Sequence, residues 1–140
     1  MPAKPPEDMP RITPYLYYED LDHAIDWLIE TFGLAERSRM SNPEGKTSHA
    51  EMSLGEGVVM MGHPGPDYQN PKRHGHVCQL VHVYVDDVDE HCDSARAAGA
   101  TILSEPEDKA YGDRVYSAED IEGHHWFFAQ HVRNGMKSPG

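Results

Sequence analysis

The chain has 140 residues, which suits one domain or two small halves that share a core. Its formal net charge of −12, from 24 acidic and 12 basic residues, argues against binding to nucleic acid or to an anionic membrane. The sequence has no apolar run long enough for a membrane span or a signal peptide, so we expect a cytoplasmic protein. Cys78 and Cys92 lie in apolar segments, and we expect both to be reduced, buried thiols.

The first half of the sequence predicts a strand, a helix and three further strands. The proline-rich residues 1–10 are expected to form a flexible arm. A strand is expected at 12–18. A helix then begins after Asp20, which is a good N-cap, and ends at Gly33. The apolar residues of this segment recur at helical spacing. The three further strands are expected at 34–40, 48–54 and 58–61.

The second half of the sequence predicts the same elements after a loop. Residues 63–75 are rich in proline and glycine, and we expect a linker there. A strand at 77–85 is followed by Asp87 and then by Glu90, which is a capping-box pattern for a helix. A loop is expected to begin at Pro106, and the last two strands form an aromatic-rich hairpin. The three strands after the helix are expected at 100–103, 116–119 and 124–128.

The two halves repeat each other in sequence. The segment 16–22 reads Leu-Tyr-Tyr-Glu-Asp-Leu-Asp and matches the segment 83–89, which reads Val-Tyr-Val-Asp-Asp-Val-Asp. The pair Glu-Gly at 56–57 likewise falls on the pair at 122–123. A repeat of roughly 66 residues predicts two tandem βαβββ modules. We therefore expect an arm at 1–10, a first module at 11–62, a linker at 63–75, a second module at 76–131 and a flexible tail at 132–140.

Short motifs in both halves are similar to those of a known family. The motifs are Tyr-x-Glu-Asp-Leu-Asp at 17–22, Val-Asp-Asp-Val-Asp at 85–89, Gly-Asp-Arg at 112–114 and Asp-Ile-Glu-Gly-His at 120–124. Over about residues 11–131 the chain resembles the vicinal oxygen chelate superfamily, which includes glyoxalase I, extradiol dioxygenases and bleomycin-resistance proteins. Ile121 replaces the proline that is usual in the last motif. The resemblance implies an α+β fold in which two tandem βαβββ modules form a cavity with their curved sheets.

The same resemblance implies where a divalent metal binds in the family's enzymes. The ligands are His, Gln or Glu side chains near the start of the first strand and late in the last strand of each module. The matching positions, counted from the helix caps and the turn glycines, are Thr13, Met61, Leu80 and Phe127. None of these side chains is a suitable ligand for a divalent ion. We therefore expect no cofactor and no Lewis-acid chemistry.

Alternation along the strands predicts which side chains line the cavity. Aromatic rings and a thioether would supply contact area, and His, Glu and Arg side chains would orient polar groups. For each of these residues the alternative is a structural role. His82 would otherwise be a core histidine, and Arg114 would otherwise pair with Asp113 or Glu119. The ligand-binding candidates are Tyr15, Tyr17, His49, Glu51, Met61, His82, Tyr84, Arg114, Trp126 and Phe127.

The sequence therefore predicts a metal-free protein that binds a small hydrophobic or aromatic organic molecule, as bleomycin-resistance proteins do when they sequester a drug. The resemblance also implies a homodimer. An alternative function is a metal-dependent, glyoxalase-like lyase or dioxygenase with an altered metal site formed by His49, Glu51 and His82. A third alternative is an interaction protein that has no small-molecule ligand.

Overall fold

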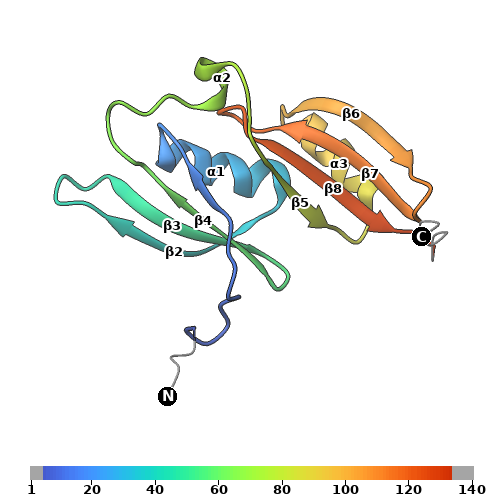
Figure 1. Cartoon of the computed structure of the whole chain (residues 1–140), viewed down its shortest axis with the longest axis horizontal. Helices are drawn as coiled ribbons and strands as arrows, with labels where there is room; N and C mark the ends of the chain where they lie inside the picture. Colours follow the sequence, from blue (N-terminus) through green and yellow to red (C-terminus); the bar gives the residue numbers. More distant parts are fainter. Residues whose placement is uncertain (1–4, 134–140) are drawn as a thin grey trace. The chain divides into compact units, whose positions relative to one another are not determined.

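The structure, a computed structural model, describes residues 5–133 (Figure 1). The chain divides into two compact units between Tyr68 and Gln69. We call the part up to Tyr68 unit 1 and the part from Gln69 unit 2, and we describe each unit by itself. Residues 5–10 of the expected arm form neither helix nor strand. The first four residues of the arm and most of the expected tail at 132–140 lie outside the described residues.

The described residues of unit 1 form a four-stranded sheet and one long helix, α1 (Figure 1). The strands lie in the order β1-β4-β3-β2. β1 runs parallel to β4, and the other neighbouring strands are antiparallel. The elements in chain order are β1 (Tyr15–Tyr17), α1 (Leu21–Phe32), β2 (Ala35–Ser41), β3 (Thr47–Leu54) and β4 (Gly57–Gly62).

The ends of α1 are set by local chemistry, as the sequence predicts. The side chain of Asp20 accepts a hydrogen bond from the backbone N–H of His23 and so satisfies one of the amides at the start of the helix. Gly33 ends the helix in the left-handed conformation, at φ 79°, which a glycine adopts without a Cβ clash. The buried residues of α1 form one stripe, which consists of Leu21, Ala24, Ile25, Leu28, Thr31 and Phe32.

The core of unit 1 lies between this stripe and one face of the sheet. The strand residues that are almost fully buried lie beside one another across the sheet, because Leu16 pairs with Met61 and Met61 pairs with Ala50. Met52 and Val59 form a second buried pair. α1 packs against β2 and β3, so these residues face the helix. The opposite face of the sheet, which we call the open face of unit 1, carries no described helix of this unit.

The described residues of unit 2 repeat this arrangement, which confirms the predicted tandem βαβββ fold. Its sheet has the order β5-β8-β7-β6, with β5 parallel to β8 and the other neighbours antiparallel (Figure 1). Helix α3 packs against β6, β7 and β8, and we call the opposite sheet face the open face of unit 2. The elements are α2 (Pro71–His74), β5 (Leu80–Tyr84), α3 (Val88–Ala97), β6 (Thr101–Asp108), β7 (Asp113–Glu119) and β8 (His125–His131).

Three local features of unit 2 differ from the sequence predictions. The expected linker contains the short helix α2, which Asn70 caps by accepting a hydrogen bond from the backbone N–H of Arg73. β6 continues through Pro106, where the sequence predicts a loop, because β6 is an edge strand with irregular register and such a strand tolerates proline. Cys78 is exposed, whereas Cys92 is buried as predicted.

Among the described residues, no helix is long and apolar enough to cross a membrane.

Candidate functional site

The hairpin turns at the ends of the two sheets differ in length. Residues 55–56 alone connect β3 to β4, since Leu54 pairs with Gly57. Residues 120–124 connect β7 to β8, since Glu119 pairs with His125. Met61 and Phe127, which lie four residues after the turn glycines Gly57 and Gly123, are therefore not at equivalent positions. Their places in the two sheets differ by one residue. Because side chains alternate along a strand, one residue moves a side chain to the other face of the sheet.

Met61 consequently lies on the helix face of unit 1 and not on the open face. It pairs with Leu16 in the core, and Met60 is the residue that pairs with Tyr15. Phe127 occupies the equivalent place in unit 2, where it pairs with His82 on the open face. The prediction that Met61 and Phe127 line corresponding positions is therefore wrong for Met61.

The open face of unit 1 carries a cluster of tyrosines. Tyr15 and Tyr17 are 43% and 49% exposed, and their rings meet edge to face with centroids 5.8 Å apart. Tyr68 makes a similar edge contact with Tyr17 at 5.7 Å. The ring of Tyr15 lies over Gly62, where a Cβ atom would come within 2.9 Å of a ring carbon. Gly62 therefore leaves room for the ring of Tyr15 to lie against the sheet.

Polar groups continue from Tyr15 across the same face. The hydroxyl of Tyr15 is hydrogen-bonded to Nδ1 of His49 at 3.0 Å. Nε2 of His49 lies 3.9 Å from a carboxylate oxygen of Glu51, and Glu51 lies 4.0 Å from Nε of Arg37. Burial and the neighbouring Tyr17 raise the pKa of Tyr15, so its phenol stays protonated at neutral pH. The structure thus brings together the predicted residues Tyr15, His49 and Glu51.

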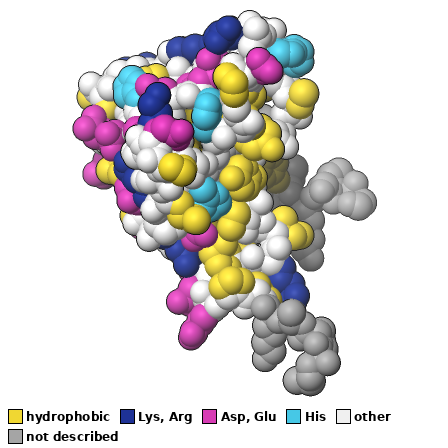
Figure 2. Space-filling model, turned by 90° about the vertical axis from the view of Figure 1, so that its left-hand side faces the viewer, with side chains coloured by type: hydrophobic (Ala, Val, Ile, Leu, Met, Phe, Trp, Pro, Cys, Tyr) yellow, Lys and Arg dark blue, Asp and Glu magenta, His cyan; other side chains and the backbone are white. Residues whose placement is uncertain are grey.

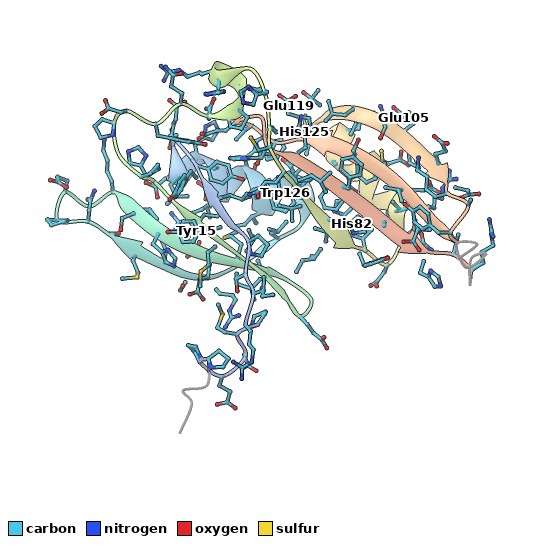
Figure 3. The ribbon with its side chains drawn as sticks, in the orientation of Figure 1. Tyr15, His82, Glu105, Glu119, His125 and Trp126 are labelled. Atoms are coloured by element: carbon cyan, nitrogen blue, oxygen red, sulfur yellow. The ribbon has the colours of Figure 1, made fainter. Side chains whose placement is uncertain are left out.

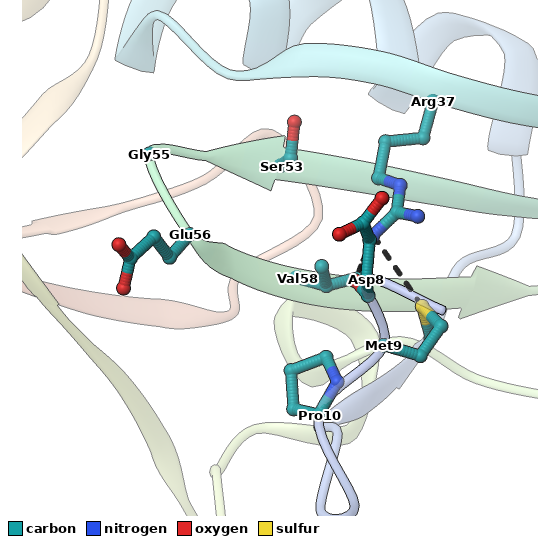
Figure 4. A pocket seen from close by; sticks show the side chains of 8 residues that line it. All are labelled: Asp8, Met9, Pro10, Arg37, Ser53, Gly55, Glu56 and Val58. Carbon is teal, nitrogen blue, oxygen red and sulfur yellow. Dashed lines mark hydrogen bonds between the residues drawn. The ribbon is translucent and has the colours of Figure 1, made fainter. Parts of the chain in front are cut away.

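Arg37 connects this polar row to the N-terminal arm. Its Nη1 donates to the backbone carbonyl of Asp8 at 3.0 Å and contacts the sulfur of Met9 at 3.4 Å (Figure 4). A pocket of about 580 Å³ lies between the arm and the β3–β4 hairpin, and Ser53 and Val58 form part of its wall. The volume lies in the range of small-molecule sites, about 300–1,000 Å³. The sequence predicts an arm here but no pocket.

The open face of unit 2 holds a hydrogen-bonded group that the sequence does not predict. Asp113 is only 4% exposed and accepts a hydrogen bond from the hydroxyl of Tyr84 at 2.7 Å. His131 Nδ1 lies 2.8 Å from its other carboxylate oxygen. The bonds from His131 and Tyr84 lower the pKa of Asp113, and the same carboxylate raises the pKa of Tyr84. The ring of His82 lies 5.2 Å from that of Tyr84.

A signal for this group is present in the hairpin. Asp113 and His131 pair directly across β7 and β8, at equal distances from the turn. Extending the predicted hairpin outward would bring them together, but the two strands are longer than their apolar pattern indicates. The contact of Tyr84 with Asp113 spans β5, β8 and β7, so it depends on the sheet order.

Two further candidates lie on the helix side of unit 2. Trp126 is 1% exposed, pairs with Ala118 in the core, and donates its indole N–H to Asp120 at 3.0 Å. Arg114 forms ion pairs with Asp89 at 2.9 Å and with Asp108 at 3.1 Å. Asp89 belongs to the first turn of α3, so the guanidinium is held at the start of this helix. The structure therefore assigns Trp126 and Arg114 structural contacts and does not place them beside Tyr84.

Comparison with known proteins identifies the family. A model of the Glyoxalase/Bleomycin resistance protein/Dioxygenase superfamily matches residues 9–128. The chain belongs to this superfamily. An uncharacterized protein of Mycobacterium bovis is 33% identical over 129 residues, which cover 89% of this chain and 85% of the relative. An uncharacterized protein of Mycobacterium tuberculosis has the same identity, with 76% of its length covered.

Several solved structures share the fold. TioX from Micromonospora sp. ML1 is 39% identical, with a TM-score of 0.73, over 89% of this chain and 100% of that chain. A superfamily protein from Nocardioides has a TM-score of 0.62 at 17% identity, over 94% of this chain and 89% of its own. A glyoxalase I variant from Zea mays has a TM-score of 0.68 at 21% identity, over 86% of this chain and 45% of its own. The last two show the fold alone.

The residues of this chain do not fit the superfamily's metal site. With the corrected register, the matching positions are Thr13, Met60, Leu80 and Phe127, and none offers an imidazole or a carboxylate. Within residues 5–133 no group of three or more His, Cys, Asp or Glu side chains could hold a metal ion. His49 and Glu51 lie close enough to form two ligands of a site, but no third described ligand joins them.

Proposed function

We propose that this superfamily member binds a small hydrophobic or aromatic organic molecule on the open faces of its sheets. The observation that carries the proposal is the exposure of aromatic rings there. Tyr15 and Tyr17 stand on β1, whose other face carries the core residue Leu16. In unit 2, Tyr84 on β5 is 61% exposed, and the other face of β5 is half-buried. Tyrosine offers a planar apolar surface together with a polar end, which suits stacking against a flat ligand.

Polar neighbours of these rings would orient the ligand. His49 is hydrogen-bonded to Tyr15, and Glu51 lies beside it. In unit 2, His82 and Phe127 are paired on the face that carries Tyr84. A planar molecule with a few hydrogen-bonding groups would find apolar area and polar anchors on either face. The proposed ligand-binding residues are therefore Tyr15, Tyr17, His49, Glu51, His82, Tyr84 and Phe127.

Exposed apolar area beside polar groups is also visible at the surface of the molecule. Figure 2 shows hydrophobic side chains that reach the surface next to histidine and acidic side chains. A surface of this mixed kind can give a ligand both apolar contact area and hydrogen-bonding partners.

A binding screen tests the proposal. Planar aromatic compounds would be screened by thermal shift and the hits measured by calorimetry. A ligand present at 100 times its Kd should stabilise the protein by about 2.7 kcal/mol. Tyr15→Ala or Tyr84→Ala should weaken binding about tenfold or more, because each removes a stacking surface. Ile29→Ala, on the outer side of α1, should leave affinity unchanged. Absence of any ligand, or hits that neither tyrosine variant weakens, would contradict the proposal.

We include the absence of a resident metal in the proposal, because the donor set of the described residues does not fit one. Elemental analysis of protein purified without chelator should find less than one divalent ion per chain. Stoichiometric metal that is lost in His49→Ala or His82→Ala would favour the alternative, a metal-dependent lyase or dioxygenase with an altered site.

The biological role that we propose is sequestration of a drug or toxin by a cytoplasmic homodimer. Bleomycin resistance is part of the superfamily's description, which supports testing this role. Expression in a sensitive bacterium should raise the inhibitory concentration of a compound that binds in the screen, and Tyr15→Ala should reduce the effect. Light scattering would test the dimer, and cell fractionation would test the location.

A further inference from the structure

Unit 2 contains a pocket that none of the proposed ligand-binding residues lines, which we call the loop pocket. It lies between the loop that contains α2 and the end of the β7–β8 hairpin, and its volume is about 340 Å³. Lys72, His76 and Val77 form the loop wall, and Glu119 and His125 form the hairpin wall. Glu119 and His125 pair across the hairpin and lie at the same end of the sheet (Figure 3).

The two walls of the loop pocket are joined by direct contacts. The backbone N–H of Lys72 donates to the carbonyl of Glu122 at 3.1 Å, and the side-chain amide of Asn70 donates to the Glu122 carboxylate at 3.0 Å. Gly123 allows this approach, since a Cβ at that position would lie 2.7 Å from the backbone nitrogen of Lys72. The pocket is therefore preformed. Ligand binding would not carry the entropic cost of ordering the loop.

Both signs of charge face this pocket. Nζ of Lys72 lies 4.0 Å from a carboxylate oxygen of Glu119, which is longer than a hydrogen bond. The two groups therefore attract each other without a close contact, and each can form a charge-assisted bond with a third molecule. The imidazoles of His76 and His125 add donors and acceptors, and Val77 adds an apolar surface.

Charge and size together select a class of ligand. A simple anion would be repelled by Glu119 and by the net charge of −12, and a simple cation, which the net charge attracts, would still be repelled by Lys72 inside the pocket. A zwitterion has neither penalty, because its carboxylate would meet Lys72 and its ammonium group would meet Glu119. The volume, about 340 Å³, lies at the small end of ligand pockets, which run from about 300 to 1,000 Å³.

We propose that the loop pocket binds a free α-amino acid through its zwitterionic group. Lys72 and an imidazole would hold the carboxylate, Glu119 would hold the ammonium group, and Val77 would contact the side chain. This inference does not depend on the proposed aromatic ligand, since none of these residues is among those proposed to bind that ligand. The protein would then have two separable ligand sites.

Titration of the full-length protein with the L-amino acids, followed by calorimetry and by amide NMR shifts, tests the inference. At least one amino acid should bind with a Kd of about 1 mM or tighter. Its N-acetyl derivative, which lacks the ammonium group, and its amide, which lacks the carboxylate, should each bind about tenfold more weakly, as expected when one charge-assisted bond is lost. The shifted amides should include those of residues 72–77 and 119–125.

Variants make the test specific to the loop pocket. Lys72→Met and Glu119→Gln should each weaken amino-acid binding about tenfold, whereas Lys46→Met, in the β2–β3 turn of unit 1, should have no effect. Tyr15→Ala should also leave this affinity unchanged, so that failure here and failure of the aromatic site are distinguishable. The inference is overturned if no amino acid binds, if the derivatives bind as well as the zwitterion, or if neither pocket variant weakens binding.

Discussion

The turn between β7 and β8 depends on one buried carboxylate, and its removal should destabilise the protein strongly. Asp120 is 1% exposed. One of its oxygens accepts the backbone N–H groups of Glu122 and His124, and the other accepts the indole N–H of Trp126, all at 3.0 Å. These bonds shape the turn and attach it to the core, and the same turn forms a wall of the loop pocket.

Asp120→Asn isolates one of these bonds. The amide oxygen can keep the two backbone hydrogen bonds. The NH₂ group then faces the indole N–H of Trp126, so two hydrogen-bond donors face each other in the core and the hydrogen bond between these side chains is lost. A lost hydrogen bond to a charged group costs about 1.5–3 kcal/mol, and we expect about 2 kcal/mol for this variant. Trp126→Phe removes the donor and also leaves a small cavity. In the double variant no donor meets the amide, so its cost should be less than the sum by about 1–2 kcal/mol.

Urea unfolding followed by far-UV circular dichroism measures these differences, since that signal does not depend on the substituted tryptophan. Asp86→Asn, at an exposed position, is the matched control and should change stability by no more than about 0.5 kcal/mol. Costs for Asp120→Asn and Trp126→Phe that add without coupling would refute the stabilising role of the Asp120–Trp126 hydrogen bond. An Asp120→Asn variant as stable as the control would refute it equally.

Three further predictions concern stability and the open faces. The folded pKa of Asp113 is lowered, so its ionised form stabilises the fold above the unfolded value of about 4, and this stabilisation disappears as the pH falls through the folded pKa. Asp113→Asn should therefore lower stability at pH 7 and flatten its decline in acid, which urea unfolding at a series of pH values would measure. Leu28→Ala should cost about 2–5 kcal/mol in urea, because Leu28 is fully buried, whereas Ile29→Ala should cost much less. Gly62→Ala should push the ring of Tyr15 off the sheet and weaken aromatic binding in calorimetry as Tyr15→Ala does; unchanged affinity would argue against a role for that ring.

Much of the architecture could be predicted because it rests on local patterns. Asp20 and Asp87 stand before apolar residues at helical spacing, and both cap helices in the structure. The two similar segments around these caps predict the duplicated module, which the two sheets confirm. The grouping of Tyr15 with His49 and Glu51 could be predicted in part, since alternation places His49 and Glu51 on one face of β3.

The sites could be predicted less completely, because they depend on contacts between strands. Nothing in the apolar pattern indicates that Tyr84 reaches Asp113 across β8, or that Glu122 anchors the loop that contains Lys72. Such contacts follow from the order and register of the strands. Several acidic residues lie near Arg114 in the sequence, and the structure pairs it with Asp108 and with the more distant Asp89.

The sequence by itself determined the two βαβββ modules and the limits of α1, since spacing and residue type are local properties. Only the tertiary structure decided which methionine, Met60 or Met61, lies on the open face. It did so because the β3–β4 turn is shorter than the β7–β8 turn, and one residue of difference reverses the direction of a strand side chain. The loop pocket was decided in the same way, by backbone contacts at Gly123 that join segments far apart in the chain.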